Sequence, residues 1–334
     1  MKKAISASAR LRALAVALLL AVSLSGCSLL TPSRADVSPE QTLVKITTPT
    51  IKTKGVLTVG YTNEDAPQVC TDANGNLTGY AVDVARAIAK SQGLSVTFVS
   101  GASADDLSEV DLMLGATTDD SSGTVSVAGN YLEDAPALFT KASADGSAPG
   151  SLSVQDLSSA TIAVQDKSQT QDVLAKCGIS AQQKTYSDVN SCLDALAKGE
   201  VQYAACDATA GAYLARAHAD IVFAGAFDST TTYGLAMKTT NAELVKAIGD
   251  ALSQMTVDGT LDAIHQAWYG SLPMSLSDAT VSGITTSAER KQAEEAAKRQ
   301  TATDTAGASS DGASADGTST SSTDSSASTT DAAA

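Results

Sequence analysis

The sequence predicts an α/β fold, and three neighbouring segments carry that prediction. Apolar residues alternate over 56–61, which is the spacing of a strand with one buried face. They recur every fourth residue over 80–90, as on one face of a helix, and Gly93 follows where such a helix would end. Alternation returns over 94–98. A strand, a helix and a second strand in this order begin an open α/β sheet.

The later segments extend this pattern. Asn74-Gly75 suits positive φ at both positions, which predicts a tight hairpin before the first helix. Further strands are predicted at 110–115, 135–141, 160–164, 201–206 and 221–224, and helices at 168–177, at 189–196 and around 244–255. Strands and helices thus alternate over residues 55–275, a length that suits two modest lobes.

Two motif sets resemble a known family. The first begins at Gly55 as Gly-x-Leu-x-Val-Gly and continues through Asp72-x-x-Gly75 to Gly79-Tyr80-x-x-Asp83-x-Ala-x-Ala-Ile-Ala. The second runs from Asp258 to Gly270 as Asp-Gly-Thr, then Ile, then Trp-Tyr-Gly. Together they resemble the family 3 extracellular solute-binding proteins, which are the polar amino-acid receptors of ABC importers.

The resemblance covers about two thirds of the chain and implies a two-lobe, periplasmic-binding-protein-like fold of type II. It places a discontinuous lobe 1 at 55–134 and 233–275, and lobe 2 with the hinge crossings at 135–232. A ligand cleft is expected between the lobes. Only residues 100–109 separate two strands where the family has a longer helix, so lobe 1 is expected to be trimmed.

The amino terminus has the features of an export signal. Residues 1–26 contain four basic residues, no acidic residue and an apolar run that is too short to span a bilayer. Leu-Ser-Gly-Cys27 resembles a bacterial lipobox, with a chance cysteine behind an ordinary signal peptide as the alternative. We therefore expect an exported protein, held on the outer face of the cell membrane or the periplasmic side of a membrane by lipid on Cys27. Residues 27–54, rich in Ser and Thr, are expected to form a tether, with a short hidden strand as the alternative.

The carboxyl-terminal region, 276–334, is expected to hold a charged helix candidate at 288–300 and a disordered tail of small and polar residues. The formal net charge is −15, and removing residues 1–26 with their four basic residues gives −15 − 4 = −19. Such a surface repels phosphate backbones, so no nucleic-acid partner is expected.

Three groups of residues are candidates for ligand binding. Asp207 ends a strand in lobe 2 and matches the family's aspartate that pairs with the ligand's α-ammonium; a cap of the following helix is the alternative. Lys167, Ser168 and Gln169 begin a helix, where backbone N–H groups suit a carboxylate. Lys167 replaces the family's glycine, and it either adds a cation to the site or is a solvated lysine beside a cap.

The third group departs from the family pattern. Thr117, Thr118 and Ser121 occupy the family's Thr-x-x-Arg segment, and Ser121 stands where the family has the arginine that clamps the α-carboxylate. Gln68 stands in place of the family's stacking aromatic, and Tyr61 either substitutes for it or lies on the surface. Either Lys167 compensates for the lost arginine, or the ligand is not a simple α-amino acid, or binding is weak.

The cysteines allow one disulfide candidate. With Cys27 lipidated, four cysteines remain, and Cys177 and Cys192 lie at the end of one helix and inside the next. Their bond would close a loop of about 15 residues, and buried free thiols are the alternative. His218 and His265 lack ligand spacing, so neither a metal site nor a cofactor is expected.

The resemblance favours a binding function without catalysis. We expect a monomer that captures a small polar solute, an amino acid or derivative, and delivers it to an ABC permease. Two alternatives remain: a degenerate receptor acting as surface adhesin or sensor, and an enzyme resembling the periplasmic dehydratases of the same fold, with Glu64 or Asp207 as general acid.

Overall fold

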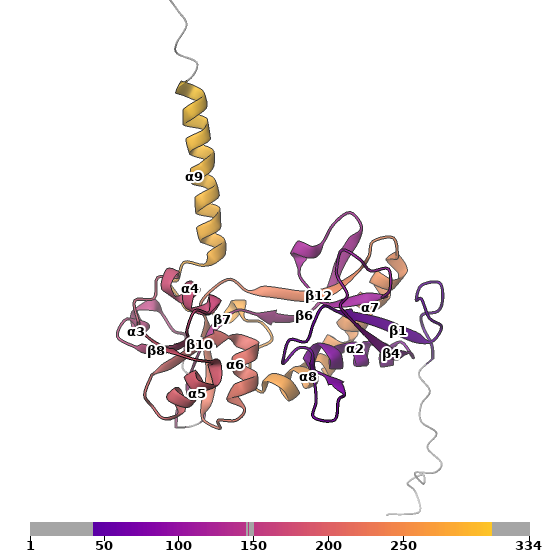
Figure 1. Cartoon of the computed structure of the whole chain (residues 1–334), viewed down its shortest axis with the longest axis horizontal. Helices are drawn as coiled ribbons and strands as arrows, with labels where there is room; N and C mark the ends of the chain where they lie inside the picture. Colours follow the sequence, from indigo (N-terminus) through magenta and orange to yellow (C-terminus); the bar gives the residue numbers. More distant parts are fainter. Residues whose placement is uncertain (1–42, 145, 147–149, 309–334) are drawn as a thin grey trace, which may run out of the picture.

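A computed structural model describes residues 43–144, 146 and 150–308, with the side chains of 301–308 left out. Two five-stranded sheets form two lobes that lie side by side (Figure 1). The first sheet has the order β4-β1-β5-β12-β6. Its strands are β1 (Val56–Tyr61), β4 (Ser95–Ser100), β5 (Leu112–Ala116), β6 (Val125–Asp134) and β12 (Thr231–Lys238). The predicted mixed α/β, two-lobe fold is confirmed.

The second sheet has the order β11-β7-β10-β8-β9. Its strands are β7 (Pro136–Lys141), β8 (Thr161–Gln165), β9 (Gln182–Tyr186), β10 (Tyr203–Asp207) and β11 (Ile221–Ala226). Strands β8, β9 and β10 are parallel to one another, and β7 is antiparallel to β10 and β11. The carboxyl ends of parallel strands are where open α/β sheets bind ligands, so this arrangement places Asp207 at a suitable edge.

Helices cover both sheets. The first lobe has α2 (Tyr80–Ser91), α7 (Ala242–Val257) and α8 (Thr260–Tyr269), which contact one another, and the small hairpin of β2 (Cys70–Thr71) and β3 (Leu77–Thr78). A 3₁₀ turn, η1 (Thr118–Asp120), occupies the connection after β5. The second lobe has α3 (Val154–Leu157), α4 (Gln169–Lys176), α5 (Val189–Ala197) and α6 (Ala208–Ala215). The carboxyl-terminal region adds a 3₁₀ turn, η2 (Ser277–Ala279), and α9 (Ser287–Ala308).

The start of α2 is fixed by close backbone packing. Gly79 has φ of 135°, and a Cβ atom there would lie 2.1 Å from the carbonyl oxygen of Gln68, so only glycine fits. The next residue, Tyr80, is buried and donates its hydroxyl to the carbonyl of Tyr131 at 2.6 Å. This contact holds the first turn of α2 against the end of β6, which leads to the other lobe.

Three segments connect the lobes. The chain passes from β6 to β7 at Asp134–Ala135 and returns between β11 and β12 over 227–230. The third connection is the C-terminal segment, residues 270–286, which leaves α8 and pairs with the second lobe through hydrogen bonds from Val281 to Ala226 and from Ser282 to Leu152, both 2.8 Å. Leu276 also donates its N–H to Glu133 at 2.8 Å, so this segment contacts the first crossing directly.

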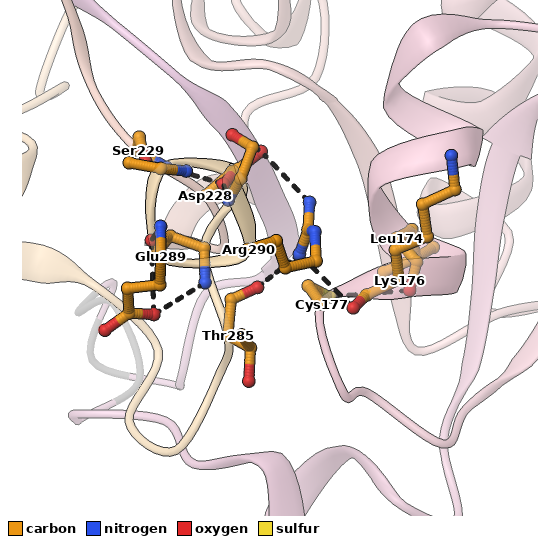
Figure 2. A network of polar contacts seen from close by, with 11 residues as sticks. Leu174, Lys176, Cys177, Asp228, Ser229, Thr285, Glu289 and Arg290 are labelled. Atoms are coloured by element: carbon orange, nitrogen blue, oxygen red, sulfur yellow. Dashed lines mark hydrogen bonds and ion pairs between the residues drawn. The ribbon is translucent and has the colours of Figure 1, made fainter. Parts of the chain in front are cut away.

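The charged helix predicted at 288–300 is present as part of α9, which also includes residues 301–308 that were assigned to the disordered tail. Leu276 and Val281 are buried, and α9 extends away from the second lobe (Figure 1). A network around Asp228, which is 4 % exposed, holds the base of α9 (Figure 2). Its carboxylate accepts bonds from the backbone N–H of Ser229 at 2.8 Å and the hydroxyl of Ser287 at 2.7 Å. Arg290 lies 4.0 Å from the same carboxylate and donates to the carbonyl of Lys176 at 3.2 Å.

The tether expected over 27–54 is wrong from residue 43 onward. Ile46 and Ile51 are 2 % and 1 % exposed and belong to the core of the first lobe. Thr50 donates to Glu243 of α7 at 2.7 Å, and the backbone of Lys52 donates to Asp111 at 2.9 Å. The predicted signal peptide, Cys27, the remainder of the tether and the tail after 308 lie outside the described residues.

The expected disulfide between Cys177 and Cys192 is not formed in the structure. Both are buried free thiols, as is Cys206, while Cys70 is a half-buried free thiol. Cys177 packs with Ile162 of β8, whereas Cys192 packs in the cluster that contains Ala163. Successive strand residues point to opposite faces, so the two cysteines lie on opposite faces of the second sheet.

No helix within the described ranges is long and apolar enough to cross a membrane.

Replacing Ile51 by Ala tests the corrected amino-terminal boundary. The substitution leaves a cavity in the core of lobe 1, and we expect the free energy of unfolding to fall by about 2–5 kcal/mol. Urea unfolding followed by circular dichroism measures the change. Leu43→Ala, at a side chain that is 83 % exposed, is the matched control and should have little effect. Equal small effects of both variants would mean that residues 43–54 are a tether after all.

Replacing Arg290 by Ala tests the attachment of α9. The variant removes the cation beside buried Asp228 and a bond to the carbonyl of Lys176, so we expect a loss of about 1–3 kcal/mol in unfolding free energy. Lys291→Ala, one residue further along the same helix and exposed, should change stability by less than about 0.5 kcal/mol. If the two variants are equally stable, the Asp228 network does not hold the C-terminal segment.

Candidate functional site

A cavity of about 240 Å³ lies between the lobes. It is lined from the first lobe by the end of β1, the loop before the small hairpin, the start of α2 and the ends of β5 and β6. The second lobe contributes the end of β10 and the start of α6. The cavity is smaller than the pockets that hold drug-sized ligands, about 300–1,000 Å³, so it suits a small solute.

Asp207 lies where the sequence prediction placed it, at the end of β10 and in the cavity wall. Although it occupies the N-cap position of α6, its side chain makes no capping hydrogen bond. Its carboxylate instead accepts a bond from Thr170 of α4 at 3.2 Å and is exposed toward the cleft. Loss of water around the carboxylate raises the pKa of Asp207, and the negative charge of Asp65 adds to the rise. The carboxylate is therefore available to a ligand.

Asp134 is a cavity residue that the sequence analysis missed. It ends β6 at the first crossing, and one of its oxygens accepts the backbone N–H groups of Ala135 at 2.9 Å and Thr209 at 3.1 Å. The other oxygen accepts the hydroxyl of Thr209 at 2.6 Å. Burial raises the pKa of Asp134 to about 6, the charge of Asp207 raises it further, and the bonds from Thr209 oppose the rise. A first-lobe carboxylate thus holds the start of α6 in the second lobe.

Three tyrosines line the same cavity: Tyr61 from β1, Tyr131 from β6 and Tyr233 from β12. Tyr131 is buried, and its hydroxyl accepts the N–H of Gly115 at 3.0 Å. Burial raises the pKa of Tyr131, which keeps the hydroxyl neutral. Of the three, only Tyr61 was predicted, because it alone ends the first strand of the family motif.

Gln68 also lines the cavity, as predicted. Its amide nitrogen donates to the hydroxyl of Tyr269 at 2.7 Å, which fixes the side chain. Its amide oxygen is buried and has no hydrogen-bond partner among the described residues. A buried acceptor without a partner costs about 1–3 kcal/mol.

Six predicted residues do not line the cavity. Ser168 caps α4 by accepting the N–H of Gln171 at 3.1 Å, and Gln169 begins that helix. The Lys167 side chain is 90 % exposed, with its ammonium 3.8 Å from Asp166. The remaining three residues, Thr117, Thr118 and Ser121, form η1 and its two caps. The structure therefore brings together Asp207, Tyr61 and Gln68 alone from the predicted set.

The charged side chains that the structure places in the cavity wall are all acidic. Asp65, Asp134 and Asp207 line it, and no lysine or arginine does so within the described part of the chain. In residues 43–144, 146 and 150–308, no group of three or more His, Cys, Asp and Glu side chains is placed to hold a metal ion. The wall thus presents negative charge from both lobes to whatever occupies the cavity.

Comparisons with known proteins support the two-lobe α/β fold described above. The family model described as bacterial extracellular solute-binding proteins, family 3, matches residues 57–271. The L-cystine-binding protein TcyJ of Escherichia coli K12 is 25 % identical over 228 residues, which are 66 % of this chain and 85 % of that protein.

Two solved structures show the same fold. The unliganded, open L-cystine receptor of Neisseria gonorrhoeae aligns with a TM-score of 0.55 at 21 % identity, covering 66 % of this chain and 95 % of that one. A substrate-binding protein of a polar amino acid uptake transporter from Streptococcus thermophilus aligns with a TM-score of 0.57 at 18 % identity, covering 66 % and 88 %. Residues 272–286 of the C-terminal segment and helix α9 lie beyond the residues that the family model matches.

The raised pKa of Asp134 predicts a specific pH dependence. An aspartate in an unfolded chain has a pKa of about 3.9, so the folded protein holds this proton more tightly. The resulting stabilisation is present below pH about 4 and is lost as the pH rises through about 6. Asn is neutral at every pH, so the Asp134→Asn variant does not lose this stabilisation as the pH rises. The free energy of unfolding of the variant, relative to that of the wild type, should therefore increase by up to about 3 kcal/mol between pH 4 and pH 7.

Urea unfolding at pH 4, 5, 6 and 7 measures this difference. Asp105→Asn, at an exposed loop residue, serves as the control and should follow the wild type at every pH. If the difference in free energy of unfolding between Asp134→Asn and the wild type stays constant across this pH range, the raised pKa of Asp134 is contradicted.

Proposed function

Because the chain belongs to family 3 of the bacterial extracellular solute-binding proteins, we propose that it is the lipid-anchored, extracytoplasmic substrate-binding component of an ABC importer. It captures a small polar solute, an amino acid or derivative, between two closing lobes. The observation that carries the proposal is the cavity that both lobes line with carboxylates, Asp65 and Asp134 from one and Asp207 from the other.

Contacts from both lobes provide a mechanism for closure. A solute that binds Asp65 on lobe 1 and Asp207 on lobe 2 gains both interactions fully when the lobes approach, so it favours the closed state. The crossings at 134–135 and 227–230 supply the hinge. Thr170 of α4 contacts Asp207 within lobe 2, so closure brings Asp207 and α4 toward lobe 1 as one unit.

Export and anchoring rest on the amino-terminal sequence. The basic start, the short apolar run and the Leu-Ser-Gly-Cys27 motif support cleavage before Cys27 and its lipidation. The lipid holds the receptor, as a monomer, at the membrane that contains the permease. The relative named as an L-cystine-binding protein and the family match support a transport role.

The wall of the cavity disfavours the dehydratase alternative. A hydroxylated cyclohexadienyl acid brings its own carboxylate, and the described lining offers aspartates and no basic side chain to receive it. One fold neighbour is an ancestral cyclohexadienyl dehydratase, but at 21 % identity the likeness concerns the fold alone. Capture without catalysis is therefore the function that we propose.

A thermal-shift panel tests the proposed function. The mature chain is heated with amino acids, cystine, diamines, polyamines, short peptides and organic acids. A solute at about 100 times its Kd stabilises by about 2.7 kcal/mol, which raises Tm measurably. Asp207→Ala should weaken binding of the active solute about 10- to 100-fold, whereas Asp105→Ala should not. No shift with any solute would contradict a receptor function.

A further inference from the structure

We propose that the cavity takes an organic cation without a carboxylate, namely a diamine or polyamine such as the decarboxylated form of a basic amino acid. This inference rests on the proposed function, and it specifies the solute within the class of amino acids and their derivatives. Three features support the proposal: the negative charge of the wall, its aromatic rings, and the lack of a cationic side chain in the described wall to pair with a ligand carboxylate.

The charge of the wall comes first. Asp65 and Asp134 belong to lobe 1 and Asp207 to lobe 2, so residues of both lobes give the cavity negative charge. Burial raises the pKa of Asp207 and of Asp134, and repulsion by a neighbouring carboxylate adds to the rise, from Asp65 at Asp207 and from Asp207 at Asp134. Closing the lobes removes water and strengthens this repulsion. A ligand with two ammonium groups can pair with aspartates of both lobes, whereas a single α-ammonium neutralises one negative charge.

The aromatic rings suit the rest of such a ligand. Tyr61, Tyr131 and Tyr233 line the same cavity as the three aspartates. Tyrosine faces attract ammonium groups and their adjacent methylenes, and apolar ring surface also packs against an alkyl chain. Burial keeps the Tyr131 hydroxyl neutral, so that ring adds no further negative charge. A cavity lined by carboxylates and tyrosine rings therefore suits an alkyl chain that carries cationic groups.

A ligand carboxylate has no cationic partner here. Ser121, the residue expected from the family resemblance to replace an arginine, is exposed and caps η1 outside the cavity. Lys167 points to solvent beside Asp166. Among the lining residues that the structure describes, none carries a positive charge. An α-amino acid would therefore place its carboxylate against three aspartates, with no charge-assisted pair in return.

The hydrogen-bond donors of an ammonium group suit the described wall better than a metal ion does. An ammonium group carries three N–H donors, which the carboxylates of the cavity can accept. A bare metal ion is disfavoured, because no cluster of three or more ligating side chains in the described chain is arranged for one.

Matched pairs of solutes test the proposal by isothermal titration calorimetry on the mature chain at neutral pH. Each pair differs by one carboxylate: cadaverine and lysine, putrescine and ornithine, agmatine and arginine. We expect at least one amine to bind ten times or more tightly than its parent amino acid. Tighter binding of the parent in every pair, or preferential binding of glutamine or cystine, would overturn the inference while leaving the receptor function standing. No heat with any solute would overturn both.

Two variants locate the bound amine. Asp65→Asn and Asp207→Asn each remove one charge with little change of shape, and each should weaken the amine ten-fold or more. Asp105→Asn is the control on the same lobe as Asp65 and should leave the affinity unchanged. Thermal unfolding of each variant without solute checks that it remains folded. Folded cavity variants with wild-type affinity would place the amine elsewhere and contradict the proposal.

Discussion

The burial of carboxylates at the cleft is the constraint on which closure of the two lobes depends. Asp134 and Asp207 come from different lobes, burial is the main cause that raises the pKa of each, and the charge of Asp207 adds to the rise at Asp134. Hydrogen bonds from Thr209 and Thr170 offset part of that cost in the present arrangement. Further closure would dry the cavity and raise the cost, so a cation that neutralises both walls is the natural trigger for closure.

The C-terminal segment adds a third connection to the two hinge crossings. It contacts the first crossing through Glu133 and the second lobe through Ala226, and it ends at the Asp228 network that holds α9. Behind the hinge, Tyr213 of α6 and Trp268 of α8 stack with ring centroids 5.9 Å apart. The lobes are thus joined by packing and by three segments, which limits the directions in which they can rotate.

The fold was predictable because strand alternation and helix spacing are local signals, and the motifs at Gly79 and Gly259 mark fixed turns. Asp207, Tyr61 and Gln68 were found because strand ends and the family motif locate them. Asp134 was missed because its role depends on Thr209, 75 residues away, and no local pattern records that contact. The packing of Ile46 and Ile51 was missed because their segment, interrupted by Pro49, has no apolar period.

The most direct measurement is a crystal structure grown with equal concentrations of cadaverine and lysine, which compete for one cavity. The account predicts a closed protein with one ammonium at Asp207, the other at Asp65 or Asp134, and no density for a carboxylate. A bound lysine with its carboxylate on the start of α4, or a closed cavity holding an uncharged solute, would contradict it.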